Sequence, residues 1–186
     1  MNAYSIALFL HIVGVLGLFV ALDLEWTGLR QIRSAITLEQ VRGWMGILKS
    51  VRKFGFASML TTVITGFYMT FTVWGGVGWI IVSLGALILV IALSIVLTGP
   101  QMAVIGQALV TEKAPFSRNF HSLANNLLLW ISIQTRIAIA LGIVFLKVAK
   151  PDLGGSLLTI GEAIVLGLAS ALPIPHRERE QIGPAN

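Results

Sequence analysis

The longest stretch without a charged residue sets the main limit on how this chain can fold. No Asp, Glu, Lys or Arg occurs from Phe54 to Thr111, a run of 58 residues. As one helix this run would extend about 87 Å at ~1.5 Å per residue, whereas the hydrocarbon core of a bilayer is only ~30 Å thick. The chain must therefore fold back within the run. The best site for the reversal is residues 74–79, where three glycines permit a tight turn and two tryptophans suit the membrane interface.

The composition indicates that the whole chain belongs in a membrane. Hydrophobic residues make up 56% of it and charged residues 11%, whereas about a quarter of the residues of a soluble domain are charged. The apolar segments predict an all-α integral membrane bundle of five transmembrane helices, a four-helix core plus one, in a single domain over residues 1–175. The expected spans are about 4–24, 54–73, 79–98, 123–148 and 156–173, and a polar tail follows over 176–186.

Local signals predict where several helices begin and end. The first helix is expected to continue past its span to about residue 34. Thr37 and Gln40 fit a capping box, so a new helix should begin there. Gly99-Pro100 is expected to kink or end the third helix, because proline removes one hydrogen bond and clashes with the preceding turn. The many small residues of the fifth span would allow close helix packing.

The basic residues predict the orientation of the chain. Ten Lys and Arg residues lie in the loop after the first span, the loop after the third span and the tail, whereas the opposite side has only Lys147 and Lys150. Cytoplasmic loops carry the excess of Lys and Arg, so the N-terminus is expected outside and the tail in the cytoplasm, across a bacterial inner membrane. The same cations predict contact with anionic lipid headgroups on the cytoplasmic side rather than with nucleic acid.

One charge, Arg136, lies near the middle of the apolar fourth span. A buried arginine costs at least ~2.5 kcal/mol, so it needs a partner. Counting ~1.5 Å per residue from the outer face puts His11 and Glu162 near ~10 Å and Arg136 near ~16 Å. An Arg136–Glu162 ion pair on adjacent antiparallel helices is therefore predicted. With Gln134 and Tyr68, these residues form a candidate ligand pocket toward the outer side. Alternatively, the pair only neutralises itself and fixes the helix register.

The sequence leaves several roles open for His11. It could be a hydrogen-bonded packing residue, a proton relay or a ligand. Met69 lies at a similar estimated depth, so a His11/Met69 axial pair for haem b is an alternative. No H-x-x-x-H or E-x-x-H spacing, phosphate loop, dinucleotide fingerprint or nucleophile elbow occurs, so neither a metal site nor an enzyme is predicted. The chain has no cysteine, which excludes thiolate metal sites and iron–sulfur clusters.

Several short motifs resemble those of a known group of proteins. They are Leu10-His11-Ile12, Arg52-Lys53, Thr65-Gly66-Phe67-Tyr68 and Trp79. Their order over residues 4–101 resembles a family of small bacterial multi-span membrane proteins, largely of unknown function, and distantly the copper-resistance D and membrane-type protoporphyrinogen oxidase families. The resemblance implies a helical bundle, in some relatives with b-type haem on a first-span histidine matching His11. The oxidases carry a histidine and a lysine just inside the third span, whereas residues 79–83 here contain neither, so protoporphyrinogen oxidation is not expected.

The leading prediction is a polytopic inner-membrane protein whose polar pocket binds a small ligand or a membrane partner. Three alternatives stay open. The first is a haem-binding redox protein that uses His11. The second is a small proton-coupled transporter in which Glu162 titrates. The third is a structural subunit or homo-oligomer that makes contact through the small residues of the fifth span.

Overall fold

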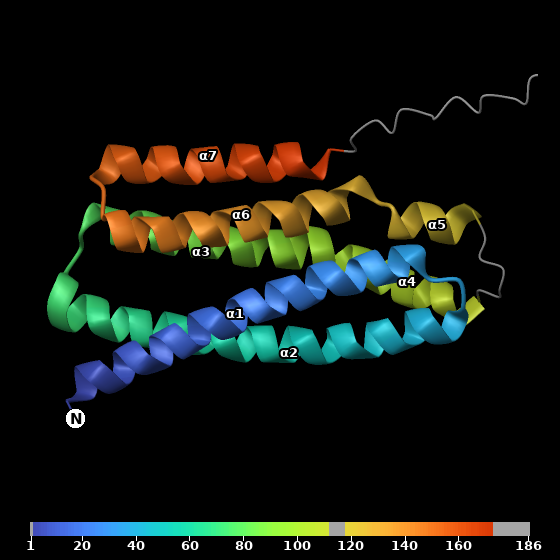
Figure 1. Cartoon of the computed structure of the whole chain (residues 1–186), viewed down its shortest axis with the longest axis horizontal. Coiled ribbons are helices and arrows are strands. Elements are labelled where there is room, and N and C mark those ends of the chain that lie inside the picture. The colour runs from blue at the N-terminus through green and yellow to red at the C-terminus, as the bar shows by residue number, and fades with distance from the viewer. Residues whose placement is uncertain (1, 112–117, 173–186) are drawn as a thin grey trace, which may run out of the picture.

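Five long helical stretches make up the structure (Figure 1). The computed structural model describes residues 2–111 and 118–172, and within these ranges nearly every residue is helical and none is in a strand. The elements are α1 (Ala3–Ser34), α2 (Leu38–Met69), η1 (Thr70–Trp74), α3 (Gly78–Leu93), η2 (Ser94–Thr98), α4 (Gly99–Thr111), α5 (Arg118–Ala124), α6 (Leu127–Ala149) and α7 (Leu153–Ala171). The stretches long and apolar enough to cross a membrane are Ala3–Ser34, Leu38–Trp74, Gly78–Val110, Ser122–Ala149 and Leu153–Ala171. The predicted all-α bundle of five spans is confirmed, and the tail over 176–186 lies outside the described residues.

The first two helices form a long antiparallel hairpin with a short connection. α1 ends at Ser34 and α2 begins at Leu38. The predicted capping box is confirmed, because the backbone N–H of Gln40 donates to the Thr37 hydroxyl (3.3 Å) and the Thr37 N–H donates to the Gln40 side chain (3.3 Å). The basic residues from Arg30 to Lys53 consequently lie on two helices rather than in a loop.

The predicted reversal between the second and third spans is also confirmed. The π-helical turn η1 extends α2 to Trp74, and Gly75 then adopts a φ of 65°, which glycine tolerates without steric cost. α3 begins at Gly78. The rings of Trp74 and Trp79 meet edge to face across this turn, with 5.9 Å between their centroids.

The helix continues past Pro100 instead of ending there. The chain widens into the π-helical turn η2 immediately before Gly99, whose N–H donates to the Ser94 carbonyl, and α4 then carries the helix onward. A π-helical turn admits one extra residue between donor and acceptor, which accommodates proline without terminating the helix. The Leu93 carbonyl at the start of η2 accepts the Ser132 hydroxyl from α6 at 3.2 Å.

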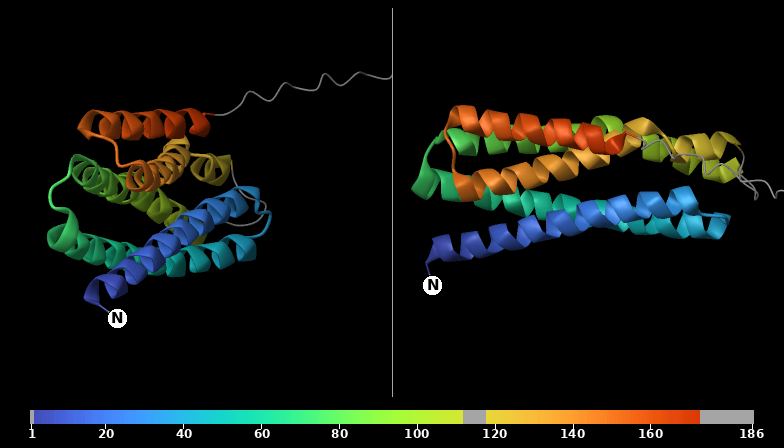
Figure 2. Two further views of the ribbon diagram at one scale, coloured as in Figure 1. Left: turned by 60° about the vertical axis from the view of Figure 1, so that its left-hand side comes forward. Right: turned by 45° about the horizontal axis from the view of Figure 1, so that its top comes forward.

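The helices divide into a hairpin and a second layer (Figures 1 and 2). α1 packs on α2, while α6 packs against α3 and α7 and also touches α1. α7 covers the side of α6 that faces away from the hairpin. The N-terminus shares one end of the bundle with the α2–α3 and α6–α7 turns, which we call the amino-terminal end, and the α1–α2 connection lies at the opposite end.

The apolar core is in two pieces. One piece lies toward the opposite end, where α1 and α2 meet α4, α5 and the first part of α6, around fully buried residues such as Leu29, Val41 and Ile133. The other lies within the second layer, among α3, α6 and α7, around Ile139 and Leu146. Neither piece fills the space between hairpin and second layer at the amino-terminal end, and a cavity lies there.

Small residues bring α7 close to α6. A Cβ atom added to Gly167 would lie 2.5 Å from the Thr135 Cα and 3.2 Å from the Gln134 carbonyl oxygen, so the two backbones nearly touch at this point. Gly142 of α6 similarly faces Ala163 of α7. The close packing expected of the fifth span therefore occurs along one face of α7.

This contact predicts different effects for two glycines of the same helix. Gly167→Ala should destabilise the protein by ~1–3 kcal/mol, because the new methyl group must push the α6 backbone away. Gly161→Ala is the matched control, since a Cβ there meets no atom within 4 Å. Thermal unfolding in detergent should show a lowered midpoint for Gly167→Ala alone. Equal midpoints for the two variants would contradict the close approach.

Candidate functional site

The most deeply buried charge is held by a glutamate far away in the sequence. Arg136 of α6 is only 3% exposed, and its guanidinium makes two parallel contacts with Glu25 of α1: Nη1 donates to Oε2 at 3.0 Å and Nη2 donates to Oε1 at 2.7 Å. It is the one ion pair among the side chains that the structure describes. Two-point contact of this kind is stronger and more directional than a single hydrogen bond.

Arg136 makes two further hydrogen bonds. Nη2 donates to the Thr98 hydroxyl (3.1 Å) and Nε to the Ser132 carbonyl (3.3 Å). The hydroxyls of Thr98 and Ser132 lie 2.8 Å apart, which closes the network. Thr98 ends η2, so the network joins α1, the π-helical turn and α6 at one point.

The predicted Arg136–Glu162 pair is therefore wrong. The buried residues of α7 are Ser156, Ile160, Ala163 and Gly167. Glu162 lies one position off this stripe and is exposed. Glu25, which is half-buried, lies on the same stripe of α1 as that helix's buried residues. The neighbouring buried residues of α1 are Ala21, Leu22, Gly28, Leu29 and Ile32. Their helical spacing is visible in the sequence and is the signal that could have identified Glu25.

A second polar cluster surrounds His11, nearer the amino-terminal end. His11 is 6% exposed, and its Nδ1 lies 3.0 Å from the Thr62 carbonyl oxygen and 3.1 Å from the Thr65 hydroxyl. The Nδ1–H donates to the carbonyl, which leaves Nε2 as an acceptor for Lys147 Nζ at 2.6 Å. Gly66 makes room for the ring, because a Cβ there would lie 3.2 Å from His11 Cε1. Residues of the Leu10-His11-Ile12 and Thr65-Gly66-Phe67-Tyr68 motifs thus meet around one imidazole.

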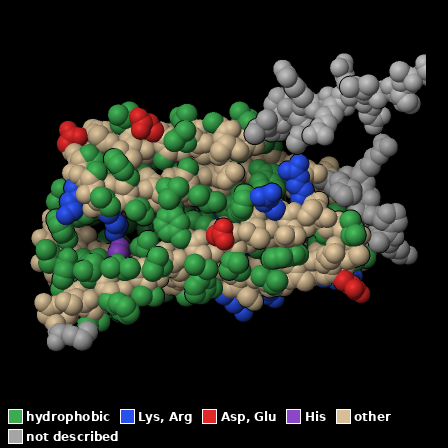
Figure 3. Space-filling model, in the orientation of Figure 1, with side chains coloured by type: hydrophobic (Ala, Val, Ile, Leu, Met, Phe, Trp, Pro, Cys, Tyr) green, Lys and Arg blue, Asp and Glu red, His purple; other side chains and the backbone are tan. Residues whose placement is uncertain are grey.

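His11 and Lys147 line a cavity of about 480 Å³ between the hairpin and the second layer. Its walls are mainly apolar and include residues from α1, α2, α3 and α6, with Trp74 and Trp79 near the amino-terminal end. Figure 3, drawn in the orientation of Figure 1, shows a hollow in the surface in which a histidine side chain lies beside a Lys or Arg side chain. Lys150, whose Nζ lies 4.2 Å from the Trp74 ring centroid, also lines the cavity. We call this space the histidine cavity.

The structure distributes the remaining predicted site residues among different places. Met69 is buried and lines the histidine cavity, whereas Tyr68 is 40% exposed and does not. Lys147 follows Arg136 by three helical turns on α6, or ~16 Å along the axis, so His11 and Arg136 belong to separate clusters. The single outer layer predicted from depth is therefore wrong. Within the described part of the chain, no three His, Cys, Asp or Glu side chains come close enough to share a metal ion.

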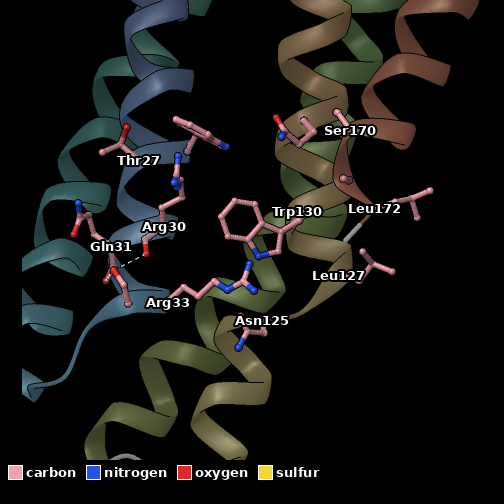
Figure 4. A pocket seen from close by; sticks show the side chains of 13 residues that line it. Thr27, Arg30, Gln31, Arg33, Asn125, Leu127, Trp130, Ser170 and Leu172 are labelled. Atoms are coloured by element: carbon pink, nitrogen blue, oxygen red, sulfur yellow. Dashed lines mark hydrogen bonds between the residues drawn. The ribbon is translucent and has the colours of Figure 1, made fainter. Parts of the chain in front are cut away.

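Gln134 lines a second hollow, of about 1100 Å³, toward the opposite end (Figure 4). This hollow lies between α1 and α6 and reaches the end of α7. Two arginines of α1 stack on indole rings within it: the Arg30 guanidinium carbon lies 4.7 Å from the Trp26 ring centroid, and that of Arg33 lies 5.7 Å from the Trp130 ring centroid. We call it the arginine groove. From the sequence, Arg30 and Arg33 are predicted only as two of the ten cytoplasmic cations that meet lipid headgroups.

The fold and these two hollows define a class, the multi-pass helical membrane proteins. Comparison of the chain with protein-family models, curated proteins and solved structures found no match.

The ion pair predicts a specific pattern in a double-mutant cycle. Glu25→Leu alone should destabilise the protein by ~3–5 kcal/mol, because it leaves the buried Arg136 charge without a partner. Arg136→Leu alone should cost less, because the Glu25 side chain it leaves unpaired is 21% exposed. The double variant should recover much of this loss, since no charge is then buried. Thermal or denaturant unfolding in detergent measures all three.

Glu162→Leu is the matched control for the cycle. Its carboxylate is exposed, so its removal should leave the unfolding midpoint near that of the unaltered protein. Losses from the two single changes that simply add in the double variant would contradict a direct Arg136–Glu25 interaction.

Proposed function

We propose that this is an inner-membrane protein that binds an amphipathic small molecule with an acidic head group in the histidine cavity. The observation that carries the proposal is the Lys147 ammonium group, which lies on the wall of a mainly apolar cavity and contacts only a neutral acceptor, His11 Nε2. In the described part of the chain, no carboxylate forms an ion pair with Lys147.

The charge of Lys147 favours an acidic head group. An ammonium ion removed from bulk water is stabilised by an anion far more than by an imidazole nitrogen, so a carboxylate or phosphate would be the preferred partner. The Nδ1 contacts with Thr62 and Thr65 hold the His11 ring in place and keep Nε2 directed at Lys147. Lys150 adds a second cation to the lining.

The apolar walls favour a hydrophobic remainder of the ligand. Ligand cavities of several hundred cubic ångströms with mainly apolar walls and few polar groups are typical of small-molecule sites. The cavity combines such walls with polar groups clustered at His11 and Lys147, so it is complementary to a molecule with one charged end. The positive-inside rule supports an N-terminus on the outer side, which would place this cavity in the outer half of the membrane.

Binding of a fluorescent long-chain fatty acid to the purified protein in detergent tests the proposal. The fatty acid should bind more tightly than its methyl ester, which has the same chain without the charge. Lys147→Met should weaken binding of the acid by at least about tenfold, as expected for the loss of a hydrogen bond between charged groups. Lys53→Met is the matched control, because Lys53 is exposed on α2 and does not line the cavity.

A second pair of variants tests the place of binding. Val144→Trp should block binding, because Val144 lines the cavity, whereas Leu141→Trp should not, because Leu141 is exposed on the same helix and lies outside the lining. Equal affinities for acid and ester, or an unchanged affinity in Lys147→Met, would refute an acidic head group at this site.

A b-type haem is a second candidate, favoured because His11 and Met69 line the same cavity. A histidine whose Nδ1–H donates to a backbone carbonyl is oriented as metal-ligating histidines usually are. Bound there, the iron would supply one-electron redox chemistry. His11 and Met69 would be its ligands, and Lys147 would have to release Nε2.

One variant separates the two candidates. Lys147→Met frees His11 Nε2, so it should strengthen haem binding but weaken fatty-acid binding. Titration with haem, followed by the Soret absorbance, should then show tighter binding in Lys147→Met and none in His11→Ala. Met69→Leu should alter the spectrum, whereas Met59→Leu, outside the cavity lining, should not. A protein that stays colourless after haem addition would eliminate this candidate.

A further inference from the structure

The arginine groove contains two hydrogen-bond donors that face each other without an acceptor. The Trp130 Nε1 atom is buried and has no hydrogen-bond partner among the described residues. Figure 4 shows the Arg33 guanidinium beside the nitrogen-bearing side of that indole ring. Because indole N–H and guanidinium groups only donate hydrogen bonds, neither can satisfy the other. An acceptor from outside the described chain would satisfy both.

The second arginine of the groove is in a similar position. Arg30 stacks on Trp26, and no carboxylate in the described ranges forms an ion pair with Arg30 or Arg33. Stacking on an indole ring orients a guanidinium but leaves its N–H groups available for a carboxylate or phosphate group. The side-chain amides of Gln31, Asn125 and Gln134, which also line the groove, add further donors.

We propose that the arginine groove binds the phosphate headgroup of an anionic membrane lipid, held by Arg30, Arg33 and the Trp130 N–H. The exposed Arg33 side chain would shift to admit one phosphate oxygen between its guanidinium and Trp130 Nε1. Phosphate suits the groove because it offers several acceptor oxygens to several donors at once. This site is separate from the histidine cavity and does not depend on the function proposed for that cavity.

The position of the groove favours a lipid over a soluble phosphate compound. The groove is framed by three helices long and apolar enough to cross a membrane, and apolar side chains such as Leu127 and Leu172 line it across from the arginines (Figure 4). Both arginines lie in the last turns of α1, at the end of the bundle where interfacial headgroups would be met. A headgroup with acyl chains would occupy the polar and the apolar lining together.

Native mass spectrometry of the detergent-purified full chain, titrated with phosphatidylglycerol or phosphatidylcholine, tests this proposal. The unaltered protein should bind phosphatidylglycerol more tightly. Arg33→Gln should lose about tenfold or more in that affinity, as expected for a lost hydrogen bond to a charged group. Trp130→Phe keeps an aromatic ring but removes the N–H, so it should also weaken binding.

Arg42→Gln is the matched control, because Arg42 is an exposed arginine near the same end and lies outside the groove lining. It should bind phosphatidylglycerol as the unaltered protein does. An equal loss in Arg42→Gln, or no loss in Arg33→Gln, would overturn the site in favour of general attraction to basic residues. Glycerol phosphate should not compete with the lipid at millimolar concentration, and displacement by it would overturn the lipid assignment in favour of a soluble phosphate compound.

Discussion

The ion pair between Arg136 and Glu25 is the constraint on which the rest of the arrangement depends. An arginine in the middle of an apolar helix cannot be left against lipid, and loss of its carboxylate partner would leave a buried charge uncompensated. Because Glu25 lies on α1, this requirement fixes the hairpin against α6. The network then extends to Thr98, so the π-helical turn before Pro100 is held at the same point. One buried charge thus positions three segments that are distant in sequence.

The two polar clusters follow one pattern along a single helix–helix contact. α1 and α6 run in opposite directions, and each cluster joins a cation of α6 to an acceptor of α1. Arg136 meets a carboxylate that neutralises its charge, and it also donates to Thr98 and Ser132. Lys147 meets only the imidazole of His11 and lies beside open space. The first cluster is therefore complete in itself, whereas the second has a charge that a further group could neutralise.

The spans and their local signals could be predicted, because each depends on a few neighbouring residues. The reversal at Gly75 and the capping box at Thr37 are examples. The partner of Arg136 could not be predicted from the estimated depth in the membrane alone. Glu162 lies at a suitable depth, but depth does not say which side of its helix a residue faces. The rotation of each helix about its own axis decides which side chains face the neighbouring helices. Glu25 lies on the buried stripe of α1, whereas Glu162 lies outside the buried stripe of α7. The arginine groove was missed for another reason, because α1, α6 and α7 form it together and no single segment reveals it.

The positions of the basic residues in the structure are informative as well as their number on each side of the membrane. Cations that only meet lipid headgroups should lie exposed around the bundle. Arg42, Lys49, Arg52 and Lys53 of α2 lie in this way. Arg30 and Arg33 instead line a hollow and stack on tryptophans. At the other end, Lys147 and Lys150 are the two cations that oppose the charge bias, and both line the histidine cavity. These four cations at the two ends of the bundle thus each line a hollow, which argues for recognition of an anion rather than for orientation alone.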